Sequence, residues 1–415
     1  MAPQDIQLEK LRAVLRAILP ANPFHSRRLH GTGLTADVAS LEEFVRVCPL
    51  TTKEELVDDH RSNPPYGSNQ SEPLSAFTRF CQTSGTTAQP LAILDTPSGW
   101  DWMLANWAQI YEAAGVRPGD AIYFAFSFGP FLGFWTAFEA AAKCGFRCLP
   151  GGGLTSAARL QAMIRHRAQV LCCTPTYALH LAEVARKERI DLRETKIEKI
   201  IVAGEPGGGV PAVREHIRNL WGGAAVLDHY GMTEVGPVAY ENLGEPGHLR
   251  VIEGAYYAEI INPETTAPAG SGEVGELVLT TLGRSACPLL RYRTGDLVRR
   301  AAASGFVLQE GIMGRTDDMI VVRGVNIYPA AVDAVVRSLS GIGEYRVRVA
   351  RRGQMTELTL EAEAESGDVL RQLERALTAA FTLRISVEQA PSGSLPRFEL
   401  KARRWVTDET RAKDA

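Results

Sequence analysis

Four short segments carry the hydroxyl, glycine, aromatic and carboxylate groups that a nucleotide site requires. They are residues 83–87 (Thr-Ser-Gly-Thr-Thr), 230–234 (Tyr-Gly-Met-Thr-Glu), 292–296 (Tyr-Arg-Thr-Gly-Asp) and 314–318 (Gly-Arg-Thr-Asp-Asp). Glycine lets backbone N–H groups approach phosphate oxygens, and hydroxyls donate further hydrogen bonds. In the first segment the candidate phosphate ligands are therefore Ser84, Gly85, Thr86 and Thr87. Taken alone, such a segment is more often an ordinary surface turn.

The second segment follows an apolar strand that we predict at 224–229. Open α/β sheets bind ligands at the carboxyl ends of their parallel strands, so this position favours a binding role. An adenine ring can stack on Tyr230, and a magnesium ion that bridges phosphates can bind Glu234. A capped turn with an exposed glutamate explains the same residues equally well.

Four more residues complete the set. Asp296 follows an alternating strand pattern and can hold two ribose hydroxyls, although turn aspartates are common. Arg315 and Asp317 lie at a predicted domain boundary, where they form either a hinge or a solvated linker pair. Lys401 follows the flexible loop 393–397, and its ammonium group can neutralise a carboxylate that meets a phosphate. A lysine near a C-terminus is usually solvated surface, but the combined inventory is the one needed to activate a carboxylic acid with ATP.

Glycines also follow the strand predicted at 197–203, in residues 204–209 (Gly-Glu-Pro-Gly-Gly-Gly). This stretch partly matches a dinucleotide-binding fingerprint, but Pro211 lies within the motif and the third glycine is absent. A turn that lines a nucleotide pocket is the better interpretation.

Composition excludes several classes of protein. The 415 residues exceed one ordinary core, so we expect two or three domains. A net charge of −3 argues against a nucleic-acid partner. The seven cysteines form no Cys-x-x-Cys pair and the histidines no His-x-x-x-His pair, which disfavours disulfides and a protein-only zinc site. No stretch approaches the ~20 apolar residues of a membrane span, and residues 5–18 predict an amphipathic helix rather than a signal peptide. We expect a cytoplasmic protein.

The order of predicted elements indicates an α/β fold. Strands and helices alternate over 120–229, beginning with an aromatic, apolar run of strand length at 120–128. This alternation predicts parallel strands covered by helices. Residues 248–300 predict a smaller antiparallel β subdomain at about 245–313. We therefore expect a large domain at 1–314 and a small, mobile α+β domain at 315–415.

Together the motifs resemble the adenylate-forming superfamily of acyl-CoA synthetases, and within it the phenylacetate–CoA ligases and related aryl-CoA ligases. The resemblance extends from 47–56 (Val-Cys-Pro-Leu-Thr-Thr-Lys-Glu-Glu-Leu) through 174–179 and 290–297 to the long run 314–329. It implies that ATP and an acid form an acyl-adenylate with release of pyrophosphate. The acyl group would then pass to coenzyme A after the small domain rotates.

The resemblance also implies a role for each candidate residue. Phosphate would bind at Ser84–Thr87, ribose at Asp296, and Mg²⁺ at Glu234 with help from Thr233. Asp317 would be the hinge, beside Arg315, and Lys401 would contact both the acyl carboxylate and the α-phosphate. The adenine pocket would comprise Gly204, Glu205, Pro206, Asp228, His229, Tyr230, Gly231 and Met232.

Two departures from the family pattern have consequences. The phosphate loop reads Ala88-Gln89 where the family usually has Gly-Lys, so one cation near the phosphates is missing. Residues 309–313 (Gln-Glu-Gly-Ile-Met) stand where many relatives carry zinc-binding cysteines, so we predict no structural zinc.

The acid should bind near Phe126, Phe128 and Phe131, with Ala203 and Gly204 opposite. Aromatic walls favour an aryl or arylacetic acid over a long fatty acid, although each ring is as well explained as core. The acceptor is coenzyme A or, alternatively, a carrier-protein thiol, an amine or a hydroxyl. A non-catalytic nucleotide-binding relative is a further alternative, and a homodimer is common among similar proteins.

Overall fold

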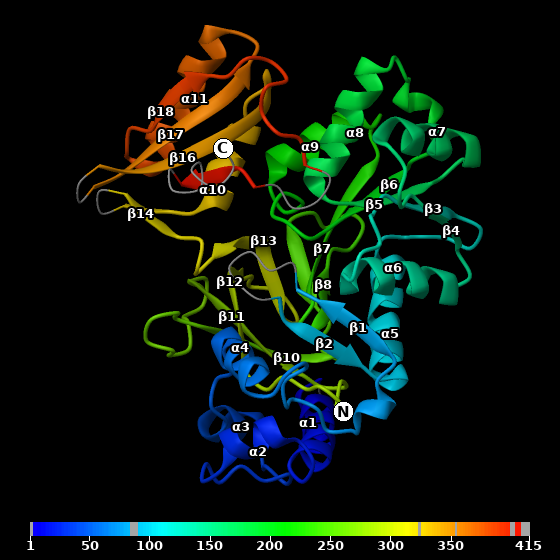
Figure 1. The fold of residues 1–415 in the computed structure, drawn as a ribbon, viewed down its shortest axis with the longest axis vertical. Helices are drawn as coiled ribbons and strands as arrows, with labels where there is room; N and C mark the ends of the chain where they lie inside the picture. The colour runs from blue at the N-terminus through cyan, green and yellow to red at the C-terminus, as the bar shows by residue number, and fades with distance from the viewer. Residues whose placement is uncertain (1–2, 84–89, 323–324, 353–354, 399–402, 408–415) are drawn as a thin grey trace.

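The computed structural model describes residues 3–83, 90–322, 325–352, 355–398 and 403–407. Figure 1 shows an N-terminal group of helices (blue), a long central sheet with covering helices, and a C-terminal unit (orange to red) beside α8 and α9. Within the described ranges, no helix combines the length and apolar character needed to cross a bilayer.

The N-terminal group contains four helices and a short 3-10 turn. They are α1 (Pro3–Ile18), α2 (Pro23–Leu29), α3 (Leu41–Val47), α4 (Lys53–Ser62) and η1 (Leu74–Ala76). The predicted amphipathic helix is confirmed, because Leu11, Leu15 and Ile18 of α1 are fully buried. Helix α4 begins with a capping box, in which Thr52 and Glu55 each bond the backbone of the other.

One sheet forms the centre of the described chain. Its order is β10 (Tyr256–Ile261), β11 (Val274–Thr281), β12 (Tyr292–Arg300), β13 (Val307–Arg315), β9 (His248–Val251), β8 (Gly236–Tyr240), β7 (Ala225–Met232), β6 (Lys199–Val202), β5 (Val170–Cys173), β3 (Ala121–Phe124) and β4 (Arg147–Pro150). The strands from β4 to β7 are parallel, as the sequence predicts. The antiparallel strands continue the same sheet, since β8 pairs with the outer edge of β7.

Helices cover both faces of the parallel strands because successive side chains point to opposite sides. On one face, Ile122 and Phe124 of β3 pack with α5 (Pro97–Ala113) and α6 (Leu132–Lys143). On the other, Tyr123 packs with the remaining helices. These are α7 (Ser156–His166), α8 (Pro175–Lys187) and α9 (Pro211–Leu220), with the short η2 (Leu192–Glu194) beside them.

The C-terminal unit is α+β, as predicted. A hairpin of β14 (Ile320–Val322) and β15 (Val325–Ile327) precedes a four-stranded sheet. That sheet has the order β18 (Ser386–Gln389), β17 (Met355–Ala364), β16 (Ile342–Arg352) and β19 (Trp405–Thr407). Its helices are α10 (Pro329–Arg337) and α11 (Gly367–Phe381). The boundary at 314–315 stays a prediction.

The strand predicted over 120–128 is wrong at its end, because β3 stops at Phe124. Phe128 adopts a positive φ of 50°, a left-handed conformation that regular strands do not contain. Phe126 and Phe128 therefore belong to the loop between β3 and α6. The separate hairpin of β1 (Arg79–Gln82) and β2 (Ala92–Asp95) leads into and out of the predicted phosphate loop.

Candidate active site

Residues predicted to bind the adenine base and the ribose lie close together. Tyr230, near the end of β7, donates a hydrogen bond of 2.6 Å from its hydroxyl to Oδ2 of Asp296 on β12. Arg315 Nη1, at the end of β13, lies 3.0 Å from the other carboxylate oxygen. Burial and the adjacent Asp296 raise the pKa of Tyr230 well above its usual value, so the phenol stays a donor. Three strands thus converge on one buried carboxylate.

The predicted hinge residue is bound to the same arginine. Arg315 Nε and Nη2 form ion-paired hydrogen bonds of 2.7 and 3.0 Å with the two oxygens of Asp317. A bidentate arginine–carboxylate pair fixes orientation as well as distance. One guanidinium therefore connects the candidate ribose site to the start of the C-terminal unit.

Glu234 lies in the turn after β7, with Thr233 before it, and its side chain is 5% exposed. Its Oε1 lies 3.5 Å from both the Tyr292 hydroxyl and Lys53 Nζ. Both contacts are longer than a strong hydrogen bond, and a hard cation such as Mg²⁺ prefers a carboxylate oxygen of this kind. Among the described residues no cluster of three metal-ligating side chains occurs, so phosphate oxygens and water would have to complete the coordination.

A buried arginine holds this turn in place. Arg284 donates a hydrogen bond of 2.6 Å to the backbone oxygen of Glu234. It also forms a bidentate ion pair with Asp95, with hydrogen bonds of 2.8 and 2.5 Å. Both side chains of the pair are almost fully buried. The position of Glu234 thus depends on residues far away in sequence.

Asp228 on β7 lies beneath the glycine-rich loop. A Cβ at Gly208 would overlap the Asp228 carboxylate, and one at Gly209 would lie 2.6 Å from the Glu310 backbone oxygen. Burial, and next the repulsion from Glu241, raise the pKa of Asp228 to about 8. The carboxyl group is therefore mostly protonated at neutral pH and can donate a hydrogen bond, for example to a purine nitrogen.

The other predicted adenine residues have mixed surroundings. Glu205 accepts a 2.8 Å hydrogen bond from the Thr176 N–H, which caps α8 and fixes the turn of Gly204 and Pro206. The His229 side chain points into the core, where it contacts Trp107 and the Ala239 carbonyl, so only its backbone can face a nucleotide. Gly231 and Met232 end β7, and at Gly231 the backbone of β8 leaves no space for a side chain.

The three predicted acid-binding rings belong to one aromatic group at the start of α6. Phe126 stacks on Phe134 with centroids 4.4 Å apart, and Phe131 meets Phe134 edge-on at 5.7 Å. Phe128 contacts Trp135 and Phe138 edge-on. Phe126, Phe128 and Phe131 are each only half-buried, so an apolar ligand can reach them. Ala203 and Gly204 follow β6 at the same sheet edge, with β5 between β3 and β6.

Ser84, Gly85, Thr86, Thr87 and Lys401 lie outside the described residues, but their flanks do not. The residues that flank the predicted phosphate loop are bonded to each other, because the Thr83 N–H donates a hydrogen bond of 3.1 Å to the Leu91 carbonyl. The Leu91 N–H donates in return to the Thr83 hydroxyl, at 3.0 Å.

The segment around Lys401 is attached to α8 on both sides. Before it, Arg397 pairs bidentately with Glu183 at 3.0 and 3.1 Å. After it, Arg404 donates 3.4 Å to the Thr176 hydroxyl. Because α8 starts directly after β5, the Arg404–Thr176 contact lies at the edge of the sheet where the candidate residues lie, whereas Arg397 binds α8 about two helical turns further along.

Sequence reasoning missed Lys53, Arg284 and the anchoring roles of Arg397 and Arg404. Each of them contacts a partner far away in sequence, so local patterns give little warning. The sequence signal that could have drawn attention to Lys53 is the helix cap at Thr52, directly before it. For Arg397 the corresponding signal is the preceding proline.

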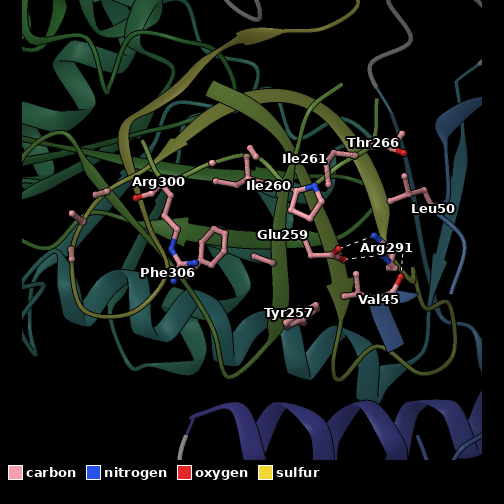
Figure 2. A pocket seen from close by; sticks show the side chains of 18 of the residues that line it. Val45, Leu50, Tyr257, Glu259, Ile260, Ile261, Thr266, Arg291, Arg300 and Phe306 are labelled. Carbon is pink, nitrogen blue, oxygen red and sulfur yellow. Dashed lines mark hydrogen bonds and ion pairs between the residues drawn. The ribbon is translucent and has the colours of Figure 1, made fainter. Parts of the chain in front are cut away.

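A separate cavity of about 940 Å³ lies beside β10, between the N-terminal segment and the antiparallel strands (Figure 2). The charged pair in its wall is satisfied internally, because Arg291 lies 2.8 Å from Glu259 and donates to the carbonyls of Val45 and Cys48. Among the described residues that line this cavity, none is a predicted site residue.

Two models of known families match this chain. The AMP-binding enzyme family matches residues 36–283, and the AMP-binding enzyme C-terminal domain matches residues 324–409. This chain belongs to the AMP-binding enzyme family. It is an adenylate-forming enzyme of the acid–CoA ligase type, since it is 30% identical to the phenylacetate-coenzyme A ligase of Escherichia coli (strain K12) over 96% of this chain and 93% of that protein.

Solved structures of a second CoA ligase indicate how the parts are arranged. A 2-hydroxyisobutyryl-CoA ligase in the postadenylation state, with R3-HIB-AMP, has a TM-score of 0.92 at 28% identity. The same ligase in the thioesterification state, with 2-HIB-AMP and CoA, has a TM-score of 0.73. Both comparisons cover 99% of this chain and 91% of the other. The arrangement of this chain is therefore more similar to the postadenylation state.

Proposed function

We propose that this AMP-forming acid–CoA ligase activates an aryl or arylacetic acid. The acid and ATP form an acyl-adenylate with release of pyrophosphate, and the acyl group then passes to coenzyme A. The observation that carries the proposal is that Glu234, Asp296 and the contact of Arg404 with Thr176, just after Lys401, lie at one edge of the sheet.

The chemistry requires two anions to meet. When an acid oxygen attacks the α-phosphorus, repulsion between carboxylate and phosphate opposes the reaction. A lysine ammonium is cationic at neutral pH, so Lys401 would offset this repulsion where the charge develops. Arg397 and Arg404 support that role, because they hold the segment on either side of Lys401 against α8.

The nucleotide would be held by residues of β7 and β12. Asp296 would accept hydrogen bonds from the ribose hydroxyls, Tyr230 would pack near the adenine, and the neutral Asp228 would donate to it. The phosphates would lie toward residues 84–87. Glu234 would hold Mg²⁺, which when bound neutralises the phosphates during the displacement.

Substitution of Lys401 tests the mechanism. Because one preorganised electrostatic group contributes about 10²–10³-fold, Lys401→Ala should slow acid-dependent pyrophosphate exchange by roughly that factor. Lys187→Ala, an exposed change on α8, is the control and should exchange normally. A Lys401→Ala rate within about threefold of wild type would remove this residue from the mechanism.

The aromatic group at Phe126, Phe128 and Phe131 supports a flat acid, since aromatic rings pack favourably at centroid distances of ~4.5–7 Å. An exchange panel should therefore favour phenylacetate and benzoates. Faster exchange with medium-chain fatty acids would contradict this choice.

Coenzyme A is the proposed acceptor, and the mass of the product separates it from a carrier-protein thiol, an amine or a hydroxyl. We place the reaction in the cytoplasm, which suits the seven free cysteines. A homodimer and the lack of structural zinc stay predictions.

A further inference from the structure

The N-terminal helix α4 brings a cation to the candidate metal ligand. Lys53 is the first residue of α4, and its Nζ lies 3.5 Å from Oε1 of Glu234. The lysine side chain is 39% exposed, whereas the glutamate is 5% exposed. Because the lysine side chain is partly exposed, its ammonium group can turn from Glu234 toward a ligand, and the movement creates no buried cavity.

The start of α4 is fixed to the sheet. Thr51 forms backbone hydrogen bonds of 2.9 and 2.8 Å with Arg291 and Arg293, on either side of Tyr292. Its hydroxyl also donates 2.6 Å to the Leu290 carbonyl. Lys53 thus stands two residues from a backbone that is bonded beside Tyr292, the other neighbour of Glu234.

Helix α4 also packs on the base of the phosphate loop. Leu56 of α4 and Leu91, directly after the loop, belong to one buried cluster. His60 bonds the Ala92 carbonyl at 2.9 Å, so a second contact joins the helix to β2. Lys53 lies about one helical turn before Leu56, toward Glu234.

The loop itself brings no positive charge, since residues 84–90 (Ser-Gly-Thr-Thr-Ala-Gln-Pro) contain neither lysine nor arginine. A triphosphate at this edge of the sheet needs cations to offset its charge. We propose that Lys53 binds the β- and γ-phosphates of ATP, which places a phosphate-binding residue in the N-terminal helical group. The inference rests on the proposed function, because it assumes that ATP binds beside Glu234.

Comparing ATP with AMP tests this role, because AMP lacks the β- and γ-phosphates. Calorimetric titrations without acid substrate, first in EDTA and then with Mg²⁺, measure both affinities. Loss of a charge-assisted hydrogen bond should make Lys53→Gln bind ATP and inorganic pyrophosphate about tenfold or more weakly. Its affinity for AMP should stay within about twofold of wild type, and Lys53→Arg should largely restore ATP binding.

Lys143→Gln is the matched control, because it removes a surface lysine that pairs with Asp101 elsewhere. It should leave both affinities unchanged. Equal losses for ATP and AMP in Lys53→Gln, or no loss for either, would overturn the inference. Wild-type protein that binds ATP yet exchanges pyrophosphate with no acid would refute the proposed function alone, and wild-type protein that binds no ATP would overturn both.

Discussion

The Arg397–Glu183 pair joins the C-terminal tail to α8, so its removal should favour other arrangements of the small domain. Glu183→Gln keeps the shape of the side chain and removes its charge. Arg397 retains its second carboxylate partner, since it also binds Glu363 at 2.7 and 3.0 Å. The substitution therefore weakens the contact between the two parts without leaving an unpaired arginine.

The size of the effect follows from exposure. The side chains of Arg397 and Glu183 are 22% and 43% exposed, so solvent screens the pair. Exposed pairs contribute about 0.2–1 kcal/mol, and a bidentate geometry favours the upper part of that range. The population of the postadenylation-like arrangement should then fall by roughly two- to fivefold relative to its competitors.

Measuring the two half-reactions separately provides the assay. Glu183→Gln should slow pyrophosphate exchange by up to about fivefold, while thioester formation from supplied acyl-adenylate should not slow. High salt should reduce the difference from wild type. Glu374→Gln, which breaks the Arg384–Glu374 pair within the small unit, is the control. Equal slowing of both half-reactions, or no change in either, would refute a role of the pair in domain arrangement.

Two further predictions concern single buried groups. The pKa of Asp228 in the folded protein, about 8, lies above the ordinary value of 3.8, so the charged carboxylate opposes folding. The contribution of Asp228 to the free energy of unfolding therefore falls as the pH rises from about 4 to about 8. The melting temperature of Asp228→Asn relative to wild type should therefore increase over that range, and a constant difference would contradict the assignment. Arg284→Met should lower the free energy of unfolding by about 3–5 kcal/mol in urea titrations, because it leaves Asp95 buried without its partner. A loss below about 1 kcal/mol would show that Asp95 finds another partner or water.

Local patterns were sufficient for the order of the elements over 120–229, but not for every element end. The alternation of strands and helices over 120–229 and the position of Tyr230–Glu234 at the end of β7 follow from periodicities and turn residues that neighbouring residues determine. The predicted strand end at 128 failed because an apolar run does not reveal the positive φ of Phe128.

Long-range pairs could not be predicted in this way. Lys53 and Glu234 are brought together by the packing of α4 on β12, and Glu205 is engaged by the start of α8. Such partners depend on how the strands are ordered in the sheet, which local sequence does not encode. The resemblance to adenylate-forming enzymes supplied the order of events, whereas the folded structure supplied these partners.

The guanidinium of Arg315 binds Asp296 and Asp317 at once, so in the proposed mechanism the ribose site and the hinge would share one partner. A ribose that competes for Asp296 also changes the contacts of the residue proposed to pivot. Thermodynamic linkage is reciprocal. If nucleotide binding changes the free energy difference between two domain arrangements, a change of arrangement alters the free energy of nucleotide binding by the same amount. Release of AMP and reorientation of the tail unit are then two measurements of one coupling constant.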